Sequence, residues 1–223
     1  AYDITPVRAT QAGLSNPFAT VSGSATITVT DAAHGALAGD FVTFSGATAT
    51  AGLDMNKEFE ISTYVDANTY TITYTGSTAN ATGNGGGTVT ATYDISTGLS
   101  ASAYGYGWGT GAWNVGTWNT PRSSSTVKID GRQWSFDNFG EDLIATVSEG
   151  GTFRWDTSVG FGTPAAIVTQ APTNSRFNLV SPVDRHVLLF GTETIIGTSS
   201  SADPLFLRFS SQEDFQTWVP TAT

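Results

Sequence analysis

The chain contains no cysteine among its 223 residues, and this absence removes several kinds of chemistry at once. Disulfide bridges, thiolate metal sites and cysteine nucleophiles are all excluded. Long apolar runs are missing as well, because no stretch of about 18 or more apolar residues occurs. The N-terminal sequence also lacks the basic and apolar regions of a secretion signal. We therefore expect neither a membrane span nor a secretion signal.

Charged residues are scarce and unbalanced. Only 13% of the residues are charged, and 9 basic against 19 acidic side chains give a formal net charge of -10. Affinity for nucleic acid comes mainly from Lys and Arg that neutralise phosphates, so this balance argues against a protein that grips DNA or RNA. It is compatible with a surface past which nucleic acid slides. The cations are scattered, and we expect them to pair with acids: Arg8, Lys57, Arg122, Lys128, Arg132, Arg154, Arg176, Arg185 and Arg208.

Short segments of alternating apolar and polar residues dominate the first half of the chain. In residues 24–30, Ile27 and Val29 share one face and three threonines share the other, which predicts a strand with one buried face. Further strands are expected over 41–45, 59–65, 69–74 and 88–93. This spacing predicts a small antiparallel β-barrel or sandwich over residues 16–95. We interpret it as a domain inserted after an N-terminal strand or arm, residues 1–15.

The last part of the chain, residues 126–223, has a different sequence pattern. Short strands are expected over 127–129, 133–137, 143–147 and 152–156, and again over 186–191 and 205–210. Four strands in so short a segment fit one blade of a β-propeller or one four-stranded meander. The second group ends near Trp218, much as the first ends near Trp155. The sequence therefore predicts an all-β chain in which an inserted barrel precedes a partial propeller.

Glycine and aromatic residues interleave between these two parts, in residues 96–125. The candidate interaction residues are Tyr104, Tyr106, Trp108, Trp113 and Trp118. The tryptophans recur every five residues, a period that fits neither helix nor strand. Large aromatics are costly to leave in water, so the segment is expected to lie against another surface, as an arm that docks on a neighbouring subunit. An irregular loop packed on its own domain is the alternative.

Several stretches resemble a known family. The strings WSFDNFGE at 134–141, GGTFRWD at 150–156, DPLFLRFSSQED at 203–214 and WVP at 218–220 look like blades of the tail nozzle proteins of short-tailed bacteriophages, also called tail tubular protein B. The opening YDITPVR at 2–8 and the glycine and aromatic segment look like the same group. The block from GDFVTFSG at 39–46 to GGTVTA at 86–91 is similar to a small β-barrel module inserted in many phage structural proteins.

The resemblance implies a structural role in the virion tail, after assembly in the host cytoplasm. Such chains form homo-oligomeric rings through which packaged DNA leaves the particle, next to tail adaptor and fibre or spike proteins. Contact with double-stranded DNA would then be passive, with no membrane insertion by this chain and no cofactor. Nozzle proteins are usually much longer, so the chain is either a fragment or a shorter virion protein with the same blades.

We expect no catalytic group of residues in this chain. His34 and His186 are far apart in sequence, which is typical of surface or capped residues rather than of a metal or catalytic pair. No G-x-S-x-G elbow occurs. The glycine-rich run at 83–87 lacks the Lys-Ser/Thr of a phosphate loop and opens a strand, so it predicts a hinge or hairpin.

Acidic side chains offer two weaker possibilities. The turn pairs Glu141-Asp142 and Glu213-Asp214 could serve as acid and base of a glycosidase, although turn acids are usually solvated. Loop carboxylates are available for calcium, but no twelve-residue calcium loop is present, and we expect no metal. These carboxylates are Asp31, Asp40, Asp54 and Asp66.

Two classes of function remain. The first is a virion structural protein that acts by assembling into a ring. The second is a carbohydrate-binding or receptor-binding β-module in which exposed tryptophans stack on sugar rings. The sequence favours the first, because the tryptophans of residues 96–125 lie in a glycine-rich linear segment rather than on rigid strands.

Overall fold

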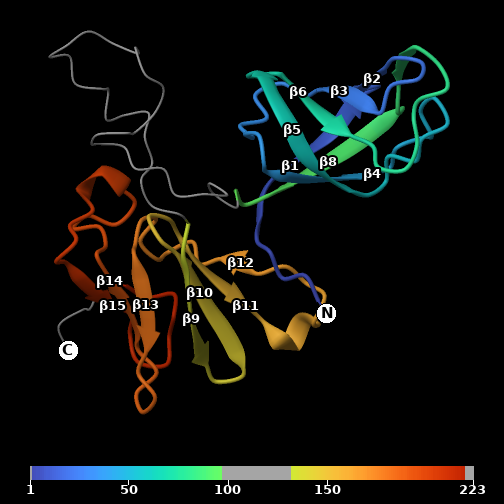
Figure 1. The fold of residues 1–223 in the computed structure, drawn as a ribbon. Coiled ribbons are helices and arrows are strands. Elements are labelled where there is room, and N and C mark those ends of the chain that lie inside the picture. Colours follow the sequence, from blue (N-terminus) through green and yellow to red (C-terminus); the bar gives the residue numbers. More distant parts are fainter. Residues whose placement is uncertain (1, 97–131, 219–223) are drawn as a thin grey trace, which may run out of the picture.

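The computed structural model describes residues 2–96 and 132–218, and the predicted all-β class is confirmed (Figure 1). The first part forms one antiparallel eight-stranded sheet in the order β1-β8-β4-β5-β6-β3-β2-β7. Its strands are β1 (Val7–Ser15), β2 (Phe18–Thr20), β3 (Thr26–Thr30), β4 (Phe41–Ser45), β5 (Glu58–Asp66), β6 (Thr69–Thr73), β7 (Gly83–Gly85) and β8 (Thr88–Asp94). The order is linear, and no ladder between the edge strands β1 and β7 is found in this sheet, so it is not closed into a barrel.

The alternation of side chains explains this sheet. In β3, Ile27 and Val29 are fully buried while the threonines between and beside them point the other way. The sheet curls so that its inward residues meet in one core. That core includes Phe18, Ile27, Val29, Val42, Phe44, Leu53, Met55, Phe59, Ile61, Tyr70, Ile72, Val89 and Tyr93.

The predicted strands of this part lie where the structure has β3, β4, β5, β6 and β8. Two short strands had no recognisable pattern: β2 has three residues, and β7 is Gly-Asn-Gly. Gly86 follows β7 with a φ of 114°, and a Cβ on it would lie 2.6 Å from the Phe18 ring, so only glycine fits this turn. Because β1 pairs with β8, the sheet also takes in residues from the segment 1–15, and its status as an inserted domain stays a prediction.

A chain of polar groups lies inside this core. The Tyr93 hydroxyl donates to Oδ2 of Asp31, and the Tyr70 hydroxyl lies 2.9 Å from that of Tyr93. Burial raises the pKa of both phenols above the ordinary value, so both keep their protons and can donate. Asp31 is 1% exposed, and its Oδ1 has no hydrogen-bond partner among the described residues. Tyr93 therefore supplies the side-chain hydrogen bond that compensates a buried carboxylate.

The second part holds two smaller antiparallel sheets. One is a meander of β9 (Trp134–Phe139), β10 (Asp142–Val147), β11 (Thr152–Trp155) and β12 (Ala166–Ile167), with the short 3-10 helix η2 (Thr157–Val159) after β11. The other consists of β13 (Phe177–Val180), β14 (Val187–Phe190) and β15 (Leu207–Phe209), with η3 (Ser199–Ser201) before β15. Both sheets are blade-like in their sequential, antiparallel order, as the sequence predicted.

The two smaller sheets share an apolar core, which Trp218 closes. Ile144 enters it from β10, and Val180, Val187 and Leu189 enter it from β13 and β14. The free edge of β13 is also satisfied. Its N–H groups at Asn178 and Val180 donate to the side chains of Ser135 and Asp137 on β9. The two sheets therefore form one packed body, which we call the two-sheet body. The expected strand at 127–129 lies outside the described residues.

Two neighbouring segments connect the eight-stranded sheet to the two-sheet body. Residues 4–6 precede β1, and residues 95–96 follow β8. The N–H of Ile95 donates to the carbonyl of Pro6 at 2.8 Å, and the N–H of Ala165 donates to the carbonyl of Ile4 at 3.0 Å. The ring of Tyr2 lies 5.8 Å from that of Phe161. Both connecting segments therefore lie against the four-stranded sheet.

We predict that Tyr93→Phe destabilises the fold by about 2 kcal/mol, because it leaves the buried Asp31 carboxylate without its donor. Tyr70→Phe is the matched control. It removes only a bond between two neutral hydroxyls, so its cost should be about 1 kcal/mol. Urea unfolding of the variants measures the difference, and equal costs would contradict the assignment of Tyr93 as the donor to Asp31.

A second prediction concerns Asp94. Burial, then the charges of Glu58 and Asp3, raise the pKa of its carboxyl from 3.8 to about 6. The folded chain thus favours protonated Asp94, and this contribution to stability is complete below about pH 4 and lost as the pH rises through 6. Asp94→Asn should raise the Tm by about 1 to 3 °C at pH 7.5, after allowance for solvent screening, and by nothing at pH 4. Thermal unfolding followed by circular dichroism tests this, and a gain that is equal at both pH values would refute it.

Candidate functional site

The five aromatic residues predicted to dock on a neighbour lie outside the described residues. These are Tyr104, Tyr106, Trp108, Trp113 and Trp118. Within residues 2–96 and 132–218, the structure offers two apolar surfaces instead, one on each side of the two-sheet body.

The first surface is the face of the four-stranded sheet that looks away from the shared core. Register pairs Ala145 with Phe136 and with Phe153, so inward and outward residues alternate consistently across the strands. The side chains on this face are Trp134, Phe136, Asn138, Leu143, Ala145, Val147, Phe153, Trp155 and Ile167. Phe136 and Ile167 remain 57% and 50% exposed. The face is thus almost entirely apolar and only partly covered.

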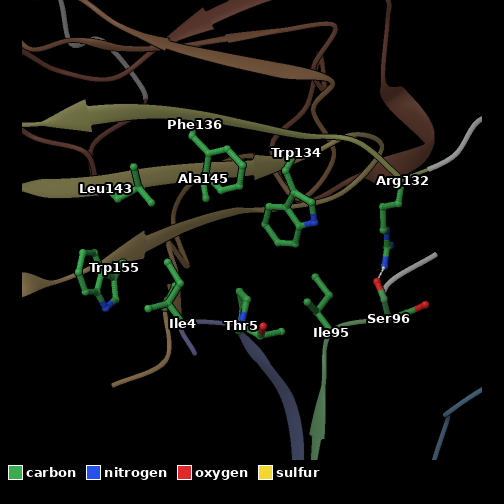
Figure 2. A pocket seen from close by; sticks show the side chains of 12 residues that line it. Ile4, Thr5, Ile95, Ser96, Arg132, Trp134, Phe136, Leu143, Ala145 and Trp155 are labelled. Atoms are coloured by element: carbon green, nitrogen blue, oxygen red, sulfur yellow. Dashed lines mark hydrogen bonds between the residues drawn. The ribbon is translucent and has the colours of Figure 1, made fainter. Parts of the chain in front are cut away.

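A cavity of about 300 Å³ opens on this face, where the connecting segments cross it (Figure 2). Ile4, Thr5 and Ile95 lie on one side of the cavity, opposite Trp134 on the other side (Figure 2). The rings of Trp134 and Phe136 stack, with 6.1 Å between centroids and 12° between planes. We use the name aromatic pocket for this cavity, which Phe136 lines, together with the exposed Ile167, which lies on the same face of the sheet next to Phe153.

The polar groups of the aromatic pocket are mainly donors. The Arg132 guanidinium lies at one end of the cavity, where Nη1 donates to the carbonyl of Ser96 (Figure 2). Trp155 lies at the other end, and its buried Nε1 has no hydrogen-bond partner among the described residues. Aromatic walls and a few donors can hold an apolar or planar group. The aromatic pocket is therefore suited to binding a ligand group of this kind.

The second surface is the face of β13, β14 and β15 that looks away from the shared core. Phe177 pairs with Phe190 and then with Leu207, and Leu179 pairs with Leu188 and then with Phe209. We call these six side chains the outer face. Five of them are exposed by 38% to 50%. On the other face, Val180, Val187 and Leu189 point into the shared core, so apolar side chains lie on both faces of this sheet.

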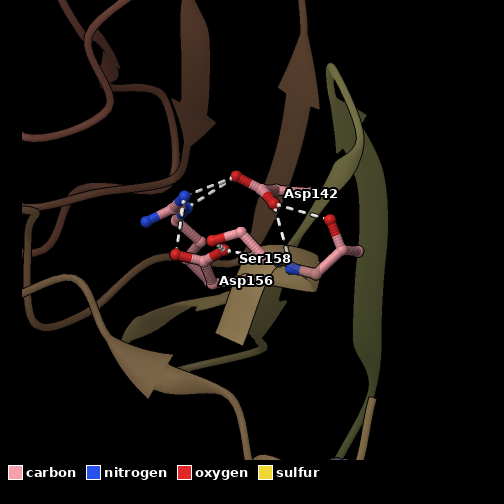
Figure 3. A network of polar contacts seen from close by, with 5 residues as sticks. Asp142, Asp156 and Ser158 are labelled. Carbon is pink, nitrogen blue, oxygen red and sulfur yellow. Dashed lines mark hydrogen bonds and ion pairs between the residues drawn. The ribbon is translucent and has the colours of Figure 1, made fainter. Parts of the chain in front are cut away.

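A third feature is a polar cluster around Arg154 (Figure 3). Its guanidinium donates to Oδ2 of Asp142 through Nε at 2.9 Å and Nη2 at 2.6 Å, and it lies 3.0 Å from Asp156. Hydrogen bonds from Ser158 lower the pKa of Asp156. The same guanidinium lies 4.6 Å from the ring centre of Phe215. The cluster therefore joins β10, β11, η2 and the turn before Trp218, and its groups are occupied by one another.

The structure does not bring the two histidines together. His34 is 2% exposed, in the loop between β3 and β4, where Nδ1 accepts from the N–H of Ala36 and Nε2 donates to the carbonyl of Asp66 at 2.9 Å. It is thus a capped residue, but not a surface one. His186 lies in the two-sheet body, where Nδ1 bonds the carbonyl of Ser210 at 2.8 Å.

Two of the acids considered for a glycosidase, Asp142 and Asp214, accept hydrogen bonds from neighbouring groups. Asp142 accepts from Arg154, and Asp214 accepts from the N–H of Gln216 and the hydroxyl of Thr217, both at 2.7 Å. The hydroxyl and then the N–H lower the pKa of Asp214. The four acids considered for calcium each accept a hydrogen bond from a near or cross-strand group: Asp31, Asp40, Asp54 and Asp66. Among the residues with assigned positions, no group of three or more His, Asp or Glu side chains is placed to hold a metal ion.

Fold and surfaces together define an all-β protein built from an eight-stranded sheet and a two-sheet body that presents exposed apolar surfaces. No family model and no curated protein matches the chain. Among solved structures, it is similar to "Phage phi92 endosialidase", with 18% identity and a TM-score of 0.34 over 95% of this chain. The match covers 31% of that structure's chain, and a likeness at this level carries no argument about function. In the described parts, no helix is long and apolar enough to cross a membrane.

We predict that Arg154→Lys destabilises the two-sheet body by about 1 kcal/mol, because Lys keeps the charge but not the planar contact with Asp142 and Phe215. Arg176→Lys is the matched control, since the ion pair that Arg176 makes among the described residues, with Glu149 at 3.7 Å, is exposed. Chemical unfolding measures both variants. Equal stability of Arg154→Lys and the unchanged protein would show that charge alone suffices.

Proposed function

We propose that this chain is a structural component of a bacteriophage tail, in which copies assemble into a ring around the path of the outgoing DNA. Its place is the virion tail, beside adaptor and fibre or spike proteins. The motifs at 134–141, 150–156 and 203–214, which resemble tail nozzle blades, support this proposal. In the structure these motifs lie on strands β9, β11 and β15 and in the turns beside them.

The observation that carries the proposal is the outer face. Its six apolar side chains lie side by side on three paired strands, with no charged residue among them. Leaving such a contiguous patch in water costs free energy that a second protein surface recovers, at about 25 cal/mol per Å² buried. A protein that works by assembly needs a surface of this kind.

The charge of the chain supports the same function. Two of the cations, Arg154 and Arg176, make ion pairs with acids, and Lys57 lies 3.6 Å from the ring centre of Tyr74. With a net charge of -10, the chain repels rather than holds a passing polyanion. We therefore expect passive contact with DNA and no catalytic role for this chain.

The test is the oligomeric state of the chain in solution. At about 50 μM, sedimentation velocity should show a species larger than a monomer, and Phe177→Lys with Leu207→Lys should lower its association constant at least tenfold, since burying two charges opposes packing. Tyr64→Lys is the control, because Tyr64 is 44% exposed but lies on β5, away from the outer face. A chain that stays monomeric without any substitution would refute the proposal.

The aromatic pocket favours a second function, a carbohydrate-binding or receptor-binding module. Trp134, Phe136 and Trp155 lie on rigid strands, and such rings stack on sugars. A glycan array with the unchanged chain and with Trp134→Ala distinguishes this function from assembly. Binding that depends on Trp134, by a chain that remains monomeric, would favour the module over the ring.

A further inference from the structure

We infer that the outer face of one copy packs on the aromatic pocket of the next, in a head-to-tail contact. This inference rests on the proposed function and specifies its interface. The partner is a second copy of this chain, and every copy contributes a different surface to each of its two neighbours.

The arrangement of the sheets within one chain is the first argument. The four-stranded sheet packs one face on the three-stranded sheet through Ile144, Val180, Val187 and Leu189. The two faces that look away from this contact are the ones that stay apolar and exposed. A head-to-tail contact joins the outer face to the part of the four-stranded sheet that the connecting segments leave exposed, around Phe136 and Ile167.

A contact between unlike surfaces also leaves less apolar surface in water than a symmetric contact does. A symmetric dimer through the outer face would bury Phe177, Phe190 and Phe209, but it would leave Phe136 and Ile167 of both copies in water. A symmetric contact through the aromatic pocket would leave the outer faces of both copies in water. Only a contact between unlike surfaces covers both with a single kind of interface.

The small size of the outer face and the concave shape of the aromatic pocket also fit this contact. The outer face has three strands of only three or four residues, so it is small beside the roughly 800 Å² of accessible surface that each partner buries in a stable complex. One such contact is weak by itself. The concave pocket, with its volume of about 300 Å³, lets side chains of the flat face enter and adds buried area. Closing a ring gives each copy two contacts, which compensates for the small size of each.

The experiment uses two variants of the full chain that each disable one surface. Variant O carries Phe177→Lys and Leu207→Lys on the outer face, and variant P carries Phe136→Lys and Ile167→Lys at the aromatic pocket. All four side chains are about half exposed, so the folds should survive. Circular dichroism and the Tm confirm this, and Ser replaces Lys at any position where the fold is lost.

In sedimentation velocity, each variant alone should be monomeric. An equimolar mixture should form a heterodimer and nothing larger, because only the pocket of variant O and the outer face of variant P remain intact. If variant P still assembles alone, or the mixture stays monomeric while the unchanged chain assembles, the head-to-tail contact is refuted and the proposed function stands. If the unchanged chain is itself monomeric, both fail.

Discussion

A β-sheet has two faces, and in this chain the requirement to cover each apolar face organises everything else. The eight-stranded sheet meets the requirement alone, by curling so that Phe18, Phe44 and Tyr93 meet inside it. The smaller sheets are too narrow to curl, so they cover one face each by packing together. Their other faces are covered only in part, by the connecting segments on one side and by nothing within residues 2–96 and 132–218 on the other. The faces that stay uncovered are the candidate interfaces.

Much of the fold could be predicted from alternation. Strands such as β3 and β6 place every second residue in the core, and that signal is local. Strands that are stabilised by partners distant in sequence could not be recognised from local alternation. β7 is Gly-Asn-Gly and exists because β2 lies beside it, and β12 has two residues that pair with β11. β13 alternates but was not predicted, because its buried Asn178 is polar and its side chain accepts a hydrogen bond from the hydroxyl of Ser135, 43 residues earlier.

The candidate surfaces were less predictable. The motifs around Trp134 and Trp155 identified the right strands, yet the pocket also needs Ile4 and Ile95, which only the folded chain brings there. Interaction was predicted for the aromatics of residues 96–125, which lie outside the described residues, and the outer face was not predicted. A signal for that face was present: in VLLF at 187–190, apolar residues fall on both sides of a strand. Such residues indicate a sheet that is covered on both faces.

The pair of segments that connects the two parts of the molecule has a mechanical consequence. Residues 4–6 and 95–96 run next to each other and are tied by the bond from Ile95 to Pro6, and each continues directly into an edge or neighbouring strand, β1 or β8, of the same sheet. Residues 4–6 are held on the two-sheet body by non-covalent contacts such as the bond from Ala165 to Ile4, whereas the chain itself continues from residue 96. A pull that separates the two parts therefore breaks these contacts first and then acts on the C-terminal end of β8. Because β8 pairs with β1 on one side and with β4 on the other, such a pull along the strand loads both ladders in shear, and their hydrogen bonds share the load.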